Sequence, residues 1–459
     1  MADFEPLLTR RYGVENSHRI DVAERHGVYQ TARKALTTMG PEQLREEVKK
    51  GSIRGRGGAG FPAGVKWGFL APKPDEKVYL VVNADESEPG TFKDRTIMME
   101  DPHRLLEGML ITCRAIGAHT AWIYVRGELS RCIERLDDAI AEARAKGYVG
   151  ARPFGVNHPI DIYTHSGAGA YICGEETALL NSLEGRRGEP RLKPPFPANK
   201  GAFDMPTIVN NVETVTQVAD IIEKGGEAWC NLSRLAPRDG GTRLYGLSGH
   251  VKTPGVYEAP VGITMRELIE DLGGGMLHED RPLKGVIPGG SSTPVLRPDR
   301  LVDAPAEDHP LHAWHGKSEI DVPMGVDTYR ALGTMLGTTC AIVMDSSVNM
   351  VEATRNLMKF YKHESCGQCT PCREGSGWFV DVLDNLAAGR GRPEDVDLLV
   401  DIANNVMGNT ICAFAEGMAM PLLGMVRQFR EEFVEAGKRG LRDTRMDKSV
   451  VALLRGGAA

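Results

Sequence analysis

The sequence lacks several features that would place it in a membrane or on a nucleic acid. No apolar run approaches the ~20 residues of a membrane span. The first residues, Met-Ala-Asp-Phe-Glu-Pro, show neither a basic stretch nor an apolar core, so no secretory signal is visible. The formal net charge of −7 gives no electrostatic reason to expect nucleic acid. We therefore expect a cytoplasmic protein with no nucleic-acid partner and no direct membrane insertion.

Cysteine is sparse outside one segment, and internal repeats are absent. Five of the nine cysteines are scattered: Cys113, Cys132, Cys173, Cys230 and Cys340. Scattered thiols favour reduced cysteines in a cytosolic compartment over a disulfide scaffold. The 459 residues suffice for two or three domains, and 41% hydrophobic and 25% charged residues are ordinary for a globular protein.

Four cysteines give the strongest signal for a cofactor. Three have C-x2-C-x2-C spacing and a fourth lies downstream: Cys366, Cys369, Cys372 and Cys412. Such a triplet with a remote fourth thiol is typical of [4Fe–4S] ligands. Cys412 is preferred over Cys340 as the fourth ligand because a helical pattern opens around it. A Cys3His zinc site that uses His363, three residues before the triplet, is the alternative.

A first glycine-rich loop, Arg54-Gly-Arg-Gly-Gly-Ala-Gly-Phe-Pro62, follows a short predicted helix that starts at Pro41. Its glycines satisfy G-x-G-x-x-G literally, but a Rossmann fingerprint needs a strand before it and a helix after it. We therefore predict an irregular loop whose backbone approaches a ligand closely, with a flexible surface loop as the alternative. The next residues add a cation and two rings: Lys66, Trp67 and Phe69.

Strand and helix patterns alternate between residues 78 and 164. Apolar runs at 78–82, 121–125 and 160–164 are separated by helical patterns that begin at Asp101-Pro102 and cover 129–146. This alternation implies a parallel sheet with right-handed crossovers. Ligands of open α/β sheets bind beyond the carboxyl ends of the strands. The acidic cluster after the first strand is therefore a binding candidate, with a solvated turn as the alternative: Asn83, Asp85, Glu86 and Glu88.

A second glycine-rich loop, residues 166–176, joins the third strand to a helical pattern. Strand, glycine loop and helix is the arrangement that binds phosphate on free backbone N–H groups. The carboxylates of Glu175 and Glu176 at the helix start suit sugar hydroxyls instead, or simply complement the helix dipole. Further polar and aromatic candidates follow: Lys193, Phe196, Asn210, Asn211 and Thr214.

The second half of the chain changes character. Residues 242–335 have hairpin strands around Lys252-Thr-Pro-Gly255 and a capping box at Thr264–Glu267, which predicts a small α+β domain of β-grasp type. Helical patterns near 349–363, 374–388, 394–407 and 412–436 predict a four-helix bundle. The expected divisions are a lead-in at 1–50, the α/β domain at 51–241, the β-grasp domain at 242–335, the bundle at 336–440 and a tail at 441–459.

Four segments together resemble the NADH-binding flavoprotein subunit (the F subunit) of bacterial respiratory complex I: 54–62, 83–95, 167–176 and 365–375. They occur in the family's order, and the resemblance covers nearly the whole chain. It implies a Rossmann-like FMN domain, a soluble-ligand-binding β-grasp domain and a C-terminal helical bundle with one [4Fe–4S] cluster. The chain has Phe414-Ala415 where the family usually has Leu-Gly, which affects packing near the cluster without removing a ligand.

The resemblance also assigns residues. It implies a flavin site of Gly57, Lys66, Asn83, Asp85, Glu86, Tyr171, Gly174, Glu175, Asn210, Asn211 and Thr214. The nicotinamide nucleotide site would comprise Phe61, Phe69, Glu88, Glu176, Lys193 and Phe196. Further cofactor-binding candidates in the two glycine loops are Gly55, Arg56, Gly58, Gly60, Gly167 and Gly169. The cluster ligands would be Cys366, Cys369, Cys372 and Cys412.

The implied activity is that of an NADH dehydrogenase. NADH donates a hydride, whereas an iron–sulfur cluster accepts single electrons, so a flavin belongs between them. No general acid or base is required, and we name no catalytic side chain. The implied partners are a thioredoxin-like [2Fe–2S] subunit and the large multi-cluster subunit of the complex I peripheral arm. The chain would then be peripheral to the cell membrane and pass electrons towards quinone.

Two other functions are compatible with parts of the pattern. Diaphorase subunits of soluble NAD-linked hydrogenases or formate dehydrogenases resemble the same core. They often carry an added N-terminal thioredoxin-like domain, and about 50 residues before the first glycine loop are too few for one. The other alternative is a non-enzymatic assembly subunit whose cysteines bind zinc.

Overall fold

A four-stranded parallel sheet organises the first half of the molecule, which we describe from a computed structural model that covers residues 4–439. Its strands are β1 (Tyr79–Ala84), β2 (Thr120–Val125), β3 (Asp161–Ser166) and β4 (Thr207–Asn211), in the order β3-β2-β1-β4. Val82 aligns with Ile123 and Asn210, so the carboxyl ends of the strands share one edge. The sequence predicted the first three strands. It missed β4, which ends in two asparagines.

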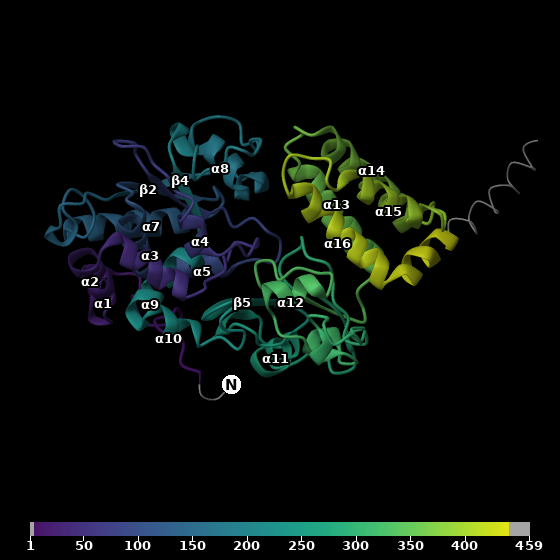
Figure 1. The fold of residues 1–459 in the computed structure, drawn as a ribbon. Coiled ribbons are helices and arrows are strands. Elements are labelled where there is room, and N and C mark those ends of the chain that lie inside the picture. The colour runs from purple at the N-terminus through teal and green to yellow at the C-terminus, as the bar shows by residue number, and fades with distance from the viewer. Residues whose placement is uncertain (1–3, 440–459) are drawn as a thin grey trace, which may run out of the picture.

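Helices cover the sheet and complete its core (Figure 1). The longer ones are α6 (Pro102–Ile116), α7 (Ser130–Ala145) and α9 (Val212–Lys224), and the shorter ones are α4 (Ala63–Trp67), α5 (Lys93–Glu100), α8 (Glu176–Leu183) and α10 (Gly226–Cys230). Asp101 caps α6 as predicted, because its carboxylate accepts a hydrogen bond from the Arg104 N–H. The parallel α/β arrangement and the β-grasp and helical parts described below confirm the predicted fold class.

The N-terminal segment is part of this body. Helices α1 (Ile20–Arg25), α2 (Gln30–Thr38) and α3 (Pro41–Lys50) pack against α6, and their apolar residues join its core. The Arg11 guanidinium forms a buried ion pair with the Asp101 carboxylate. The sequence suggested a separate polar lead-in, because the few apolar positions of these helices are scattered among charged residues. Residues 4–50 belong to the α/β part because their helices pack against it, although their composition is mostly polar.

A second sheet follows, with strand order β6-β5-β8-β7. It contains β5 (Thr242–Gly249), β6 (Gly255–Pro260), β7 (Leu283–Ile287) and β8 (Cys340–Asp345), accompanied by α11 (Met265–Glu267) and α12 (Val326–Ala331). The predicted hairpin and the capping box at Thr264 are both present. Strand β8 pairs with both β5 and β7, so this domain extends beyond residue 335, where the sequence suggested that it ends.

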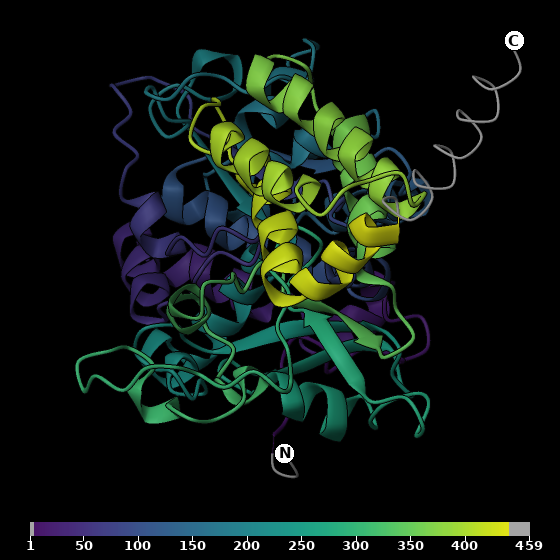
Figure 2. The same ribbon diagram turned by 90° about the vertical axis from the view of Figure 1, so that its right-hand side faces the viewer.

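The remaining helices form the predicted bundle (Figure 2). They are α13 (Met350–Glu364), α14 (Thr370–Ala387), α15 (Asp395–Val406) and α16 (Phe414–Gln428), followed by a helical stretch at 430–439. A break at Phe429 divides the last predicted helix, 412–436. The predicted tail, 441–459, lies outside the described residues. Within residues 4–439, no helix combines the length and the apolar character that crossing a bilayer requires.

Candidate functional site

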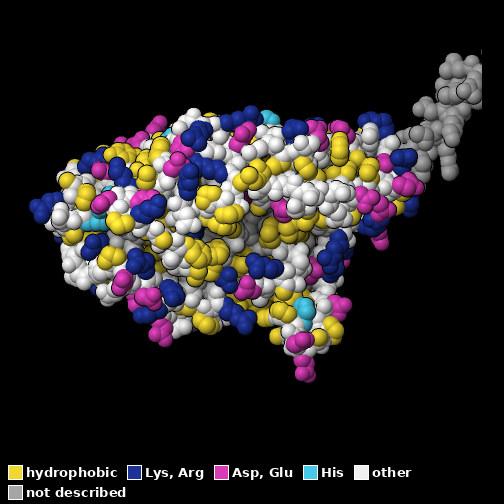
Figure 3. Space-filling model, turned by 45° about the horizontal axis from the view of Figure 1, so that its top comes forward, with side chains coloured by type: hydrophobic (Ala, Val, Ile, Leu, Met, Phe, Trp, Pro, Cys, Tyr) yellow, Lys and Arg dark blue, Asp and Glu magenta, His cyan; other side chains and the backbone are white. Residues whose placement is uncertain are grey.

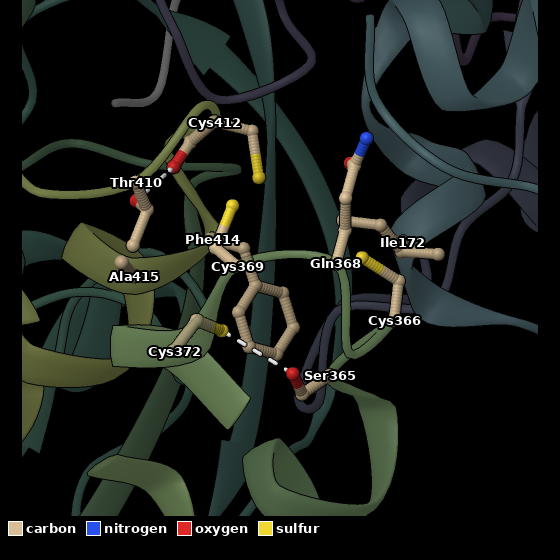
Figure 4. A pocket seen from close by; sticks show the side chains of 10 residues that line it. All are labelled: Ile172, Ser365, Cys366, Gln368, Cys369, Cys372, Thr410, Cys412, Phe414 and Ala415. Carbon is tan, nitrogen blue, oxygen red and sulfur yellow. Dashed lines mark hydrogen bonds between the residues drawn. The ribbon is translucent and has the colours of Figure 1, made fainter. Parts of the chain in front are cut away.

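Four cysteines line one pocket at the end of the bundle that faces the α/β part (Figure 4). Cys366 lies between α13 and α14, Cys369 immediately precedes α14, Cys372 lies in its first turn and Cys412 precedes α16. The short α13–α14 connection therefore supplies three thiols and the α15–α16 connection the fourth. Ile172 from the second glycine loop and Phe414 from α16 provide apolar walls. The structure thus brings together the whole predicted ligand set.

The donors of this pocket fit an iron–sulfur cluster better than zinc. His363 is exposed on α13 and does not line the pocket, so the proposed Cys3His zinc set is not assembled. Across residues 4–439, no three His, Cys, Asp or Glu side chains are close enough together to hold a single metal ion. Four thiols spread around an apolar pocket suit the separate iron corners of a [4Fe–4S] cluster. The backbone N–H of Ile411 also points at the Cys369 sulfur, at 3.5 Å.

The acidic turn after β1 is folded back into the protein. The Asn83 amide donates to the Gly174 carbonyl at 2.9 Å, which joins this turn to the second glycine loop. The Glu86 carboxylate caps α5 by accepting hydrogen bonds from the N–H groups of Asp94 and Arg95. Burial raises the pKa of Asp85 and the pKa of Glu86 to about 7 each. The alternative of a solvated acidic turn is therefore wrong.

Glu88 connects this turn to the other two parts of the molecule. Its carboxylate accepts hydrogen bonds from the Tyr171 hydroxyl and the Ser292 N–H, both at 2.6 Å. The Ser291 hydroxyl bonds both Glu88, at 3.2 Å, and Tyr361 of α13, at 2.7 Å. Burial raises the pKa of Glu88 despite these donors. We predicted no role for the Ser291-Ser292 pair from the sequence.

The first glycine loop is held against the sheet edge. The Arg56 N–H donates to the Thr214 hydroxyl at 2.9 Å, and a Cβ at Gly57 would lie 3.2 Å from the Asn211 Cβ. Gly58 and Gly60 adopt φ of +113° and +68°, which favour glycine. The Gly55 N–H donates to the Phe61 carbonyl at 2.9 Å, which closes the loop. These contacts contradict the alternative of a flexible surface loop.

The Arg56 side chain does not face this loop. Its guanidinium is fully buried and binds the Asp239 carboxylate at 3.1 Å and the Thr242 carbonyl at 2.8 Å. Arg56 can therefore contribute its backbone to a ligand site, but its guanidinium already binds protein groups and cannot reach a ligand. The second glycine loop shows a similar pattern, because Gly167 packs against Tyr124 and Gly169 against Glu128. These two glycines allow protein groups to approach each other.

Two carboxylates and two ammonium groups meet at the start of α8. The Lys66 ammonium lies 2.8 Å from Glu176, and the Lys193 ammonium lies 2.8 Å from Glu175 and 3.0 Å from Glu176. Burial would raise the pKa of Glu176, but the two ammonium groups outweigh it and lower that pKa. Glu175 also caps α8. The four charges balance, which the sequence could not reveal because Lys66 is distant in the chain.

The end of β4 supplies amide groups on the other side of this edge. The Trp67 indole N–H donates to the Asn210 side-chain oxygen at 2.9 Å. Asn211 caps α9 through its Oδ1, and its Nδ2 donates to Asp94 at 2.6 Å. The structure therefore gathers the polar candidates of β1, β4 and both glycine loops at the carboxyl edge of the sheet.

Three predicted phenylalanines remain open to solvent beside these polar groups. Phe61, Phe69 and Phe196 are 48%, 55% and 53% exposed, and the first two ring centroids are 6.0 Å apart. Exposed rings beside a polar site are suited to stacking on planar ligands. Figure 3 shows hydrophobic side chains on both sides of the hollow between the α/β part and the bundle.

The fold and the two sites define a class of protein. A polar, glycine-lined edge of a parallel sheet beside a four-thiol pocket is the architecture of a flavin- and iron–sulfur-containing electron-transfer protein. The chain matches the families described as Nuo51 FMN-binding domain over residues 48–220, SLBB domain over 244–296 and NADH-ubiquinone oxidoreductase-F iron-sulfur binding region over 352–436. The protein therefore binds FMN and a [4Fe–4S] cluster.

Relatives identify the family. One of the NADH-quinone oxidoreductase F subunits of Rhizobium meliloti is 46% identical over 94% of this chain and 97% of that protein. The mitochondrial NADH dehydrogenase [ubiquinone] flavoprotein 1 of Dictyostelium discoideum is 43% identical over 96% and 88%. This chain belongs to the F-subunit family of NADH-quinone oxidoreductases.

A crystal structure of an NAD⁺-reducing [NiFe]-hydrogenase has the same architecture. It superposes with a TM-score of 0.76 and 30% identity over 92% of this chain and 70% of that one. The fold is therefore shared with a hydrogenase module, while the curated relatives above are more similar in sequence.

Proposed function

We propose that this protein oxidises NADH with FMN and delivers the electrons singly to its [4Fe–4S] cluster, as a subunit of a multi-subunit quinone-reducing complex. One observation carries the proposal. Tyr171 belongs to the predicted flavin site and binds Glu88, while its neighbour Ile172 lines the cysteine pocket. The second glycine loop therefore brings the two cofactor sites next to each other, which suits direct electron transfer.

We propose that the carboxyl edge of the sheet holds FMN. The donors come from the first glycine loop, Lys66 and the amides of Asn83, Asn210 and Asn211, which lie on β1, β4 and the adjacent segments. FMN supplies the conversion of a two-electron hydride donation into two single-electron deliveries. The chain's residues orient the cofactor and keep water from it, and none has to transfer a proton. The half-buried Asp85 and Glu86 place titratable carboxyls close to this site.

We propose that NADH binds over the exposed rings. Phe61, Phe69 and Phe196 would stack on its planar groups, and Glu176 would accept hydrogen bonds from ribose hydroxyls. Lys193 pairs with Glu176 in the structure and would meet the phosphates. Glu88 was predicted for this site. Its carboxylate is half-buried and already accepts hydrogen bonds from Tyr171 and Ser292. We therefore propose that Glu88 positions Tyr171 beside the nucleotide site.

The proposed partners are a thioredoxin-like [2Fe–2S] subunit and a large multi-cluster subunit, which would attach the chain to the cytoplasmic face of the membrane. The runner-up function is a diaphorase module, which the fold shared with the NAD⁺-reducing hydrogenase supports. The higher identity to the F subunits of quinone oxidoreductases, with coverage of nearly their whole length, favours the quinone-reducing complex. Co-purification of the native complex distinguishes the two functions by the presence of membrane subunits or hydrogenase subunits.

Removal of one cysteine tests the link between the two cofactors. Cys369→Ser should abolish the EPR signal of the reduced cluster while most of the flavin stays bound, because Cys369 contributes only to the bundle pocket. Cys230→Ser, which changes a buried thiol outside the pocket, is the control. An unchanged cluster signal in Cys369→Ser would refute the ligand assignment. Retention of full NADH-driven cluster reduction after flavin removal would refute the proposed electron path.

A further inference from the structure

Six charged side chains form a buried cluster beneath the proposed flavin site. Its members, which we call the buried charge cluster, are Arg56, Lys93, Asp94, Glu213, Asp239 and Arg243. None is more than 4% exposed, and three cations face three anions. Among these six residues, we predicted only Arg56 from the sequence as a site residue.

Lys93 is at the centre of the buried charge cluster. Its ammonium lies 2.8 Å from the Asp94 carboxylate and 2.7 Å from the Glu213 carboxylate. Burial alone would lower the pKa of Lys93, but the two carboxylates outweigh it and raise that pKa, so the side chain stays charged. Glu213 in turn lies 3.9 Å from the Arg56 guanidinium. The ammonium therefore links two carboxylates that would otherwise repel each other.

The buried charge cluster contacts three different segments of the proposed flavin site. Asp94 accepts a hydrogen bond from the Asn211 amide at 2.6 Å, which fixes that side chain at the end of β4. The Asp94 N–H donates to Glu86 at 2.7 Å, which holds the acidic turn after β1. Arg56 is part of the first glycine loop. The buried charge cluster therefore connects the three segments that meet at the carboxyl edge of the sheet.

Stability alone is a weak explanation for such a cluster. Burying six charges carries a large desolvation penalty, and well-packed apolar side chains often give equal or greater stability. Ion pairs and hydrogen bonds, unlike apolar contacts, fix the direction of the groups that they hold. A directional network that ends on three ligand-binding segments is suited to setting their relative positions.

We propose that Lys93 is a positioning residue for FMN, which acts by holding Asp94 against Asn211 and Glu213 beside the Arg56 loop. This inference rests on the proposed flavin site. Lys93 does not contact the cofactor in this role. It determines where the Asn211 amide and the loop backbone point before the cofactor binds, so that binding does not have to pay for ordering them.

Titration of FMN into the flavin-depleted full-length chain tests the proposal, with quenching of flavin fluorescence as the signal. We expect Lys93→Met to raise the Kd for FMN at least about tenfold, which corresponds to about 1.4 kcal/mol. Since this substitution removes the cation that lies between two buried carboxylates, the second variant is the double substitution Lys93→Met with Glu213→Gln. It keeps the formal charge balanced and should show the same weakening.

Asp220→Asn is the matched control for general destabilisation. Asp220 lies on α9, as Glu213 does, and its carboxylate pairs with the buried Arg104 in a separate ion-pair network. We expect it to lower the melting temperature while changing the Kd for FMN less than about twofold. An equal loss of FMN affinity in Asp220→Asn and the Lys93 variants would overturn the proposal.

Asn211→Ala separates the inference from the proposed function on which it depends. If Asn211→Ala weakens FMN binding and both Lys93 variants bind FMN as the wild type does, the positioning role is wrong and the flavin site stands. If Asn211→Ala also binds FMN normally, the assignment of this edge to FMN is wrong, and the positioning role is wrong with it.

Discussion

We expect the Glu176 carboxylate to select between two nucleotides. NADPH carries one phosphate more than NADH, on the adenosine ribose, and a carboxylate at that ribose both binds hydroxyls and repels the phosphate. The structure adds that Glu176 is neutralised by Lys66 and Lys193. Removal of its charge would therefore also leave the Lys66 ammonium without a carboxylate partner and leave Lys193 with Glu175 alone, so that both could attract a phosphate more strongly.

We expect Glu176→Gln to raise kcat/KM for NADPH by about tenfold relative to NADH, since each 1.4 kcal/mol corresponds to a factor of ten. The measurement compares both nucleotides with ferricyanide as acceptor. Glu175→Gln is the control, because Glu175 shares Lys193 but not Lys66. If the ratio of kcat/KM for NADPH to that for NADH is unchanged in Glu176→Gln, Glu176 only stabilises the start of α8 and does not select the nucleotide.

The raised pKa of Asp85 predicts that the stability of the folded chain depends on pH. Its folded-state pKa of about 7 lies above the ordinary value of about 4, so the folded chain binds the proton more tightly than the unfolded chain does. The cost of burying the carboxylate is therefore absent below about pH 4, grows as the pH rises, and is complete above about pH 7.

Asp85→Asn removes that cost. The flavin-free variant should be more stable than the wild type by about 2 kcal/mol at pH 8, with the gain shrinking towards zero near pH 4. The expected gain is less than the full shift would give, because Asp85 is only partly buried. Denaturant unfolding across this pH range provides the measurement, and a difference that does not vary with pH would argue against a raised pKa.

Helix α16 contacts the predicted flavin site through the ring of Phe414. Phe414 lines the cysteine pocket, and its ring centroid lies 5.7 Å from that of Tyr171 and 5.8 Å from that of Tyr361. Leu, which the resemblance described above implies at this position, is smaller. The ring therefore fills space between the pocket and Tyr171 and limits the access of water to the cluster.

Phe414→Leu should shift the midpoint potential of the cluster positive by tens of millivolts, because better solvation favours the more negative reduced state. Redox titration followed by EPR measures the shift. Phe360→Leu is the control, since Phe360 contacts the same two tyrosines at 5.2 Å but does not line the pocket. Equal shifts in both variants would mean that the tyrosines, not water, set the potential.

Local patterns predicted the elements and the cysteine set well. Spacing in the chain is enough to bring Cys366, Cys369 and Cys372 together, and apolar runs marked β1, β2 and β3. Strands β4, β7 and β8 were missed because their identity depends on neighbours distant in the chain: β4 pairs with β1, and β8 inserts between β5 and β7. The same limit hid Lys93, whose two partners include a glutamate 120 positions away.

We expect the molecule as a whole to carry electrons from NADH to a partner subunit and not to reduce quinone itself. Within residues 4–439, one four-cysteine pocket is present, and a single cluster holds one electron at a time while quinone needs two. We expect the isolated chain, loaded with both cofactors, to reduce ferricyanide with NADH but not quinone. Addition of the partner subunits should restore quinone reduction. Robust, inhibitor-sensitive quinone reduction by the chain alone would contradict the proposed partners.

Strand β8 limits how this protein can be divided or recombined. It lies inside the second sheet, between β5 and β7, and the chain leaves it for α13 within a few residues. A fragment that begins at residue 336 would carry this inner strand away and leave β5 and β7 with unpaired edges. Gene fusions that exchange the cysteine-bearing helices as a cassette should therefore join the chains after Asp345. A junction before Cys340 would place the inner strand of one sheet into the sheet of another protein.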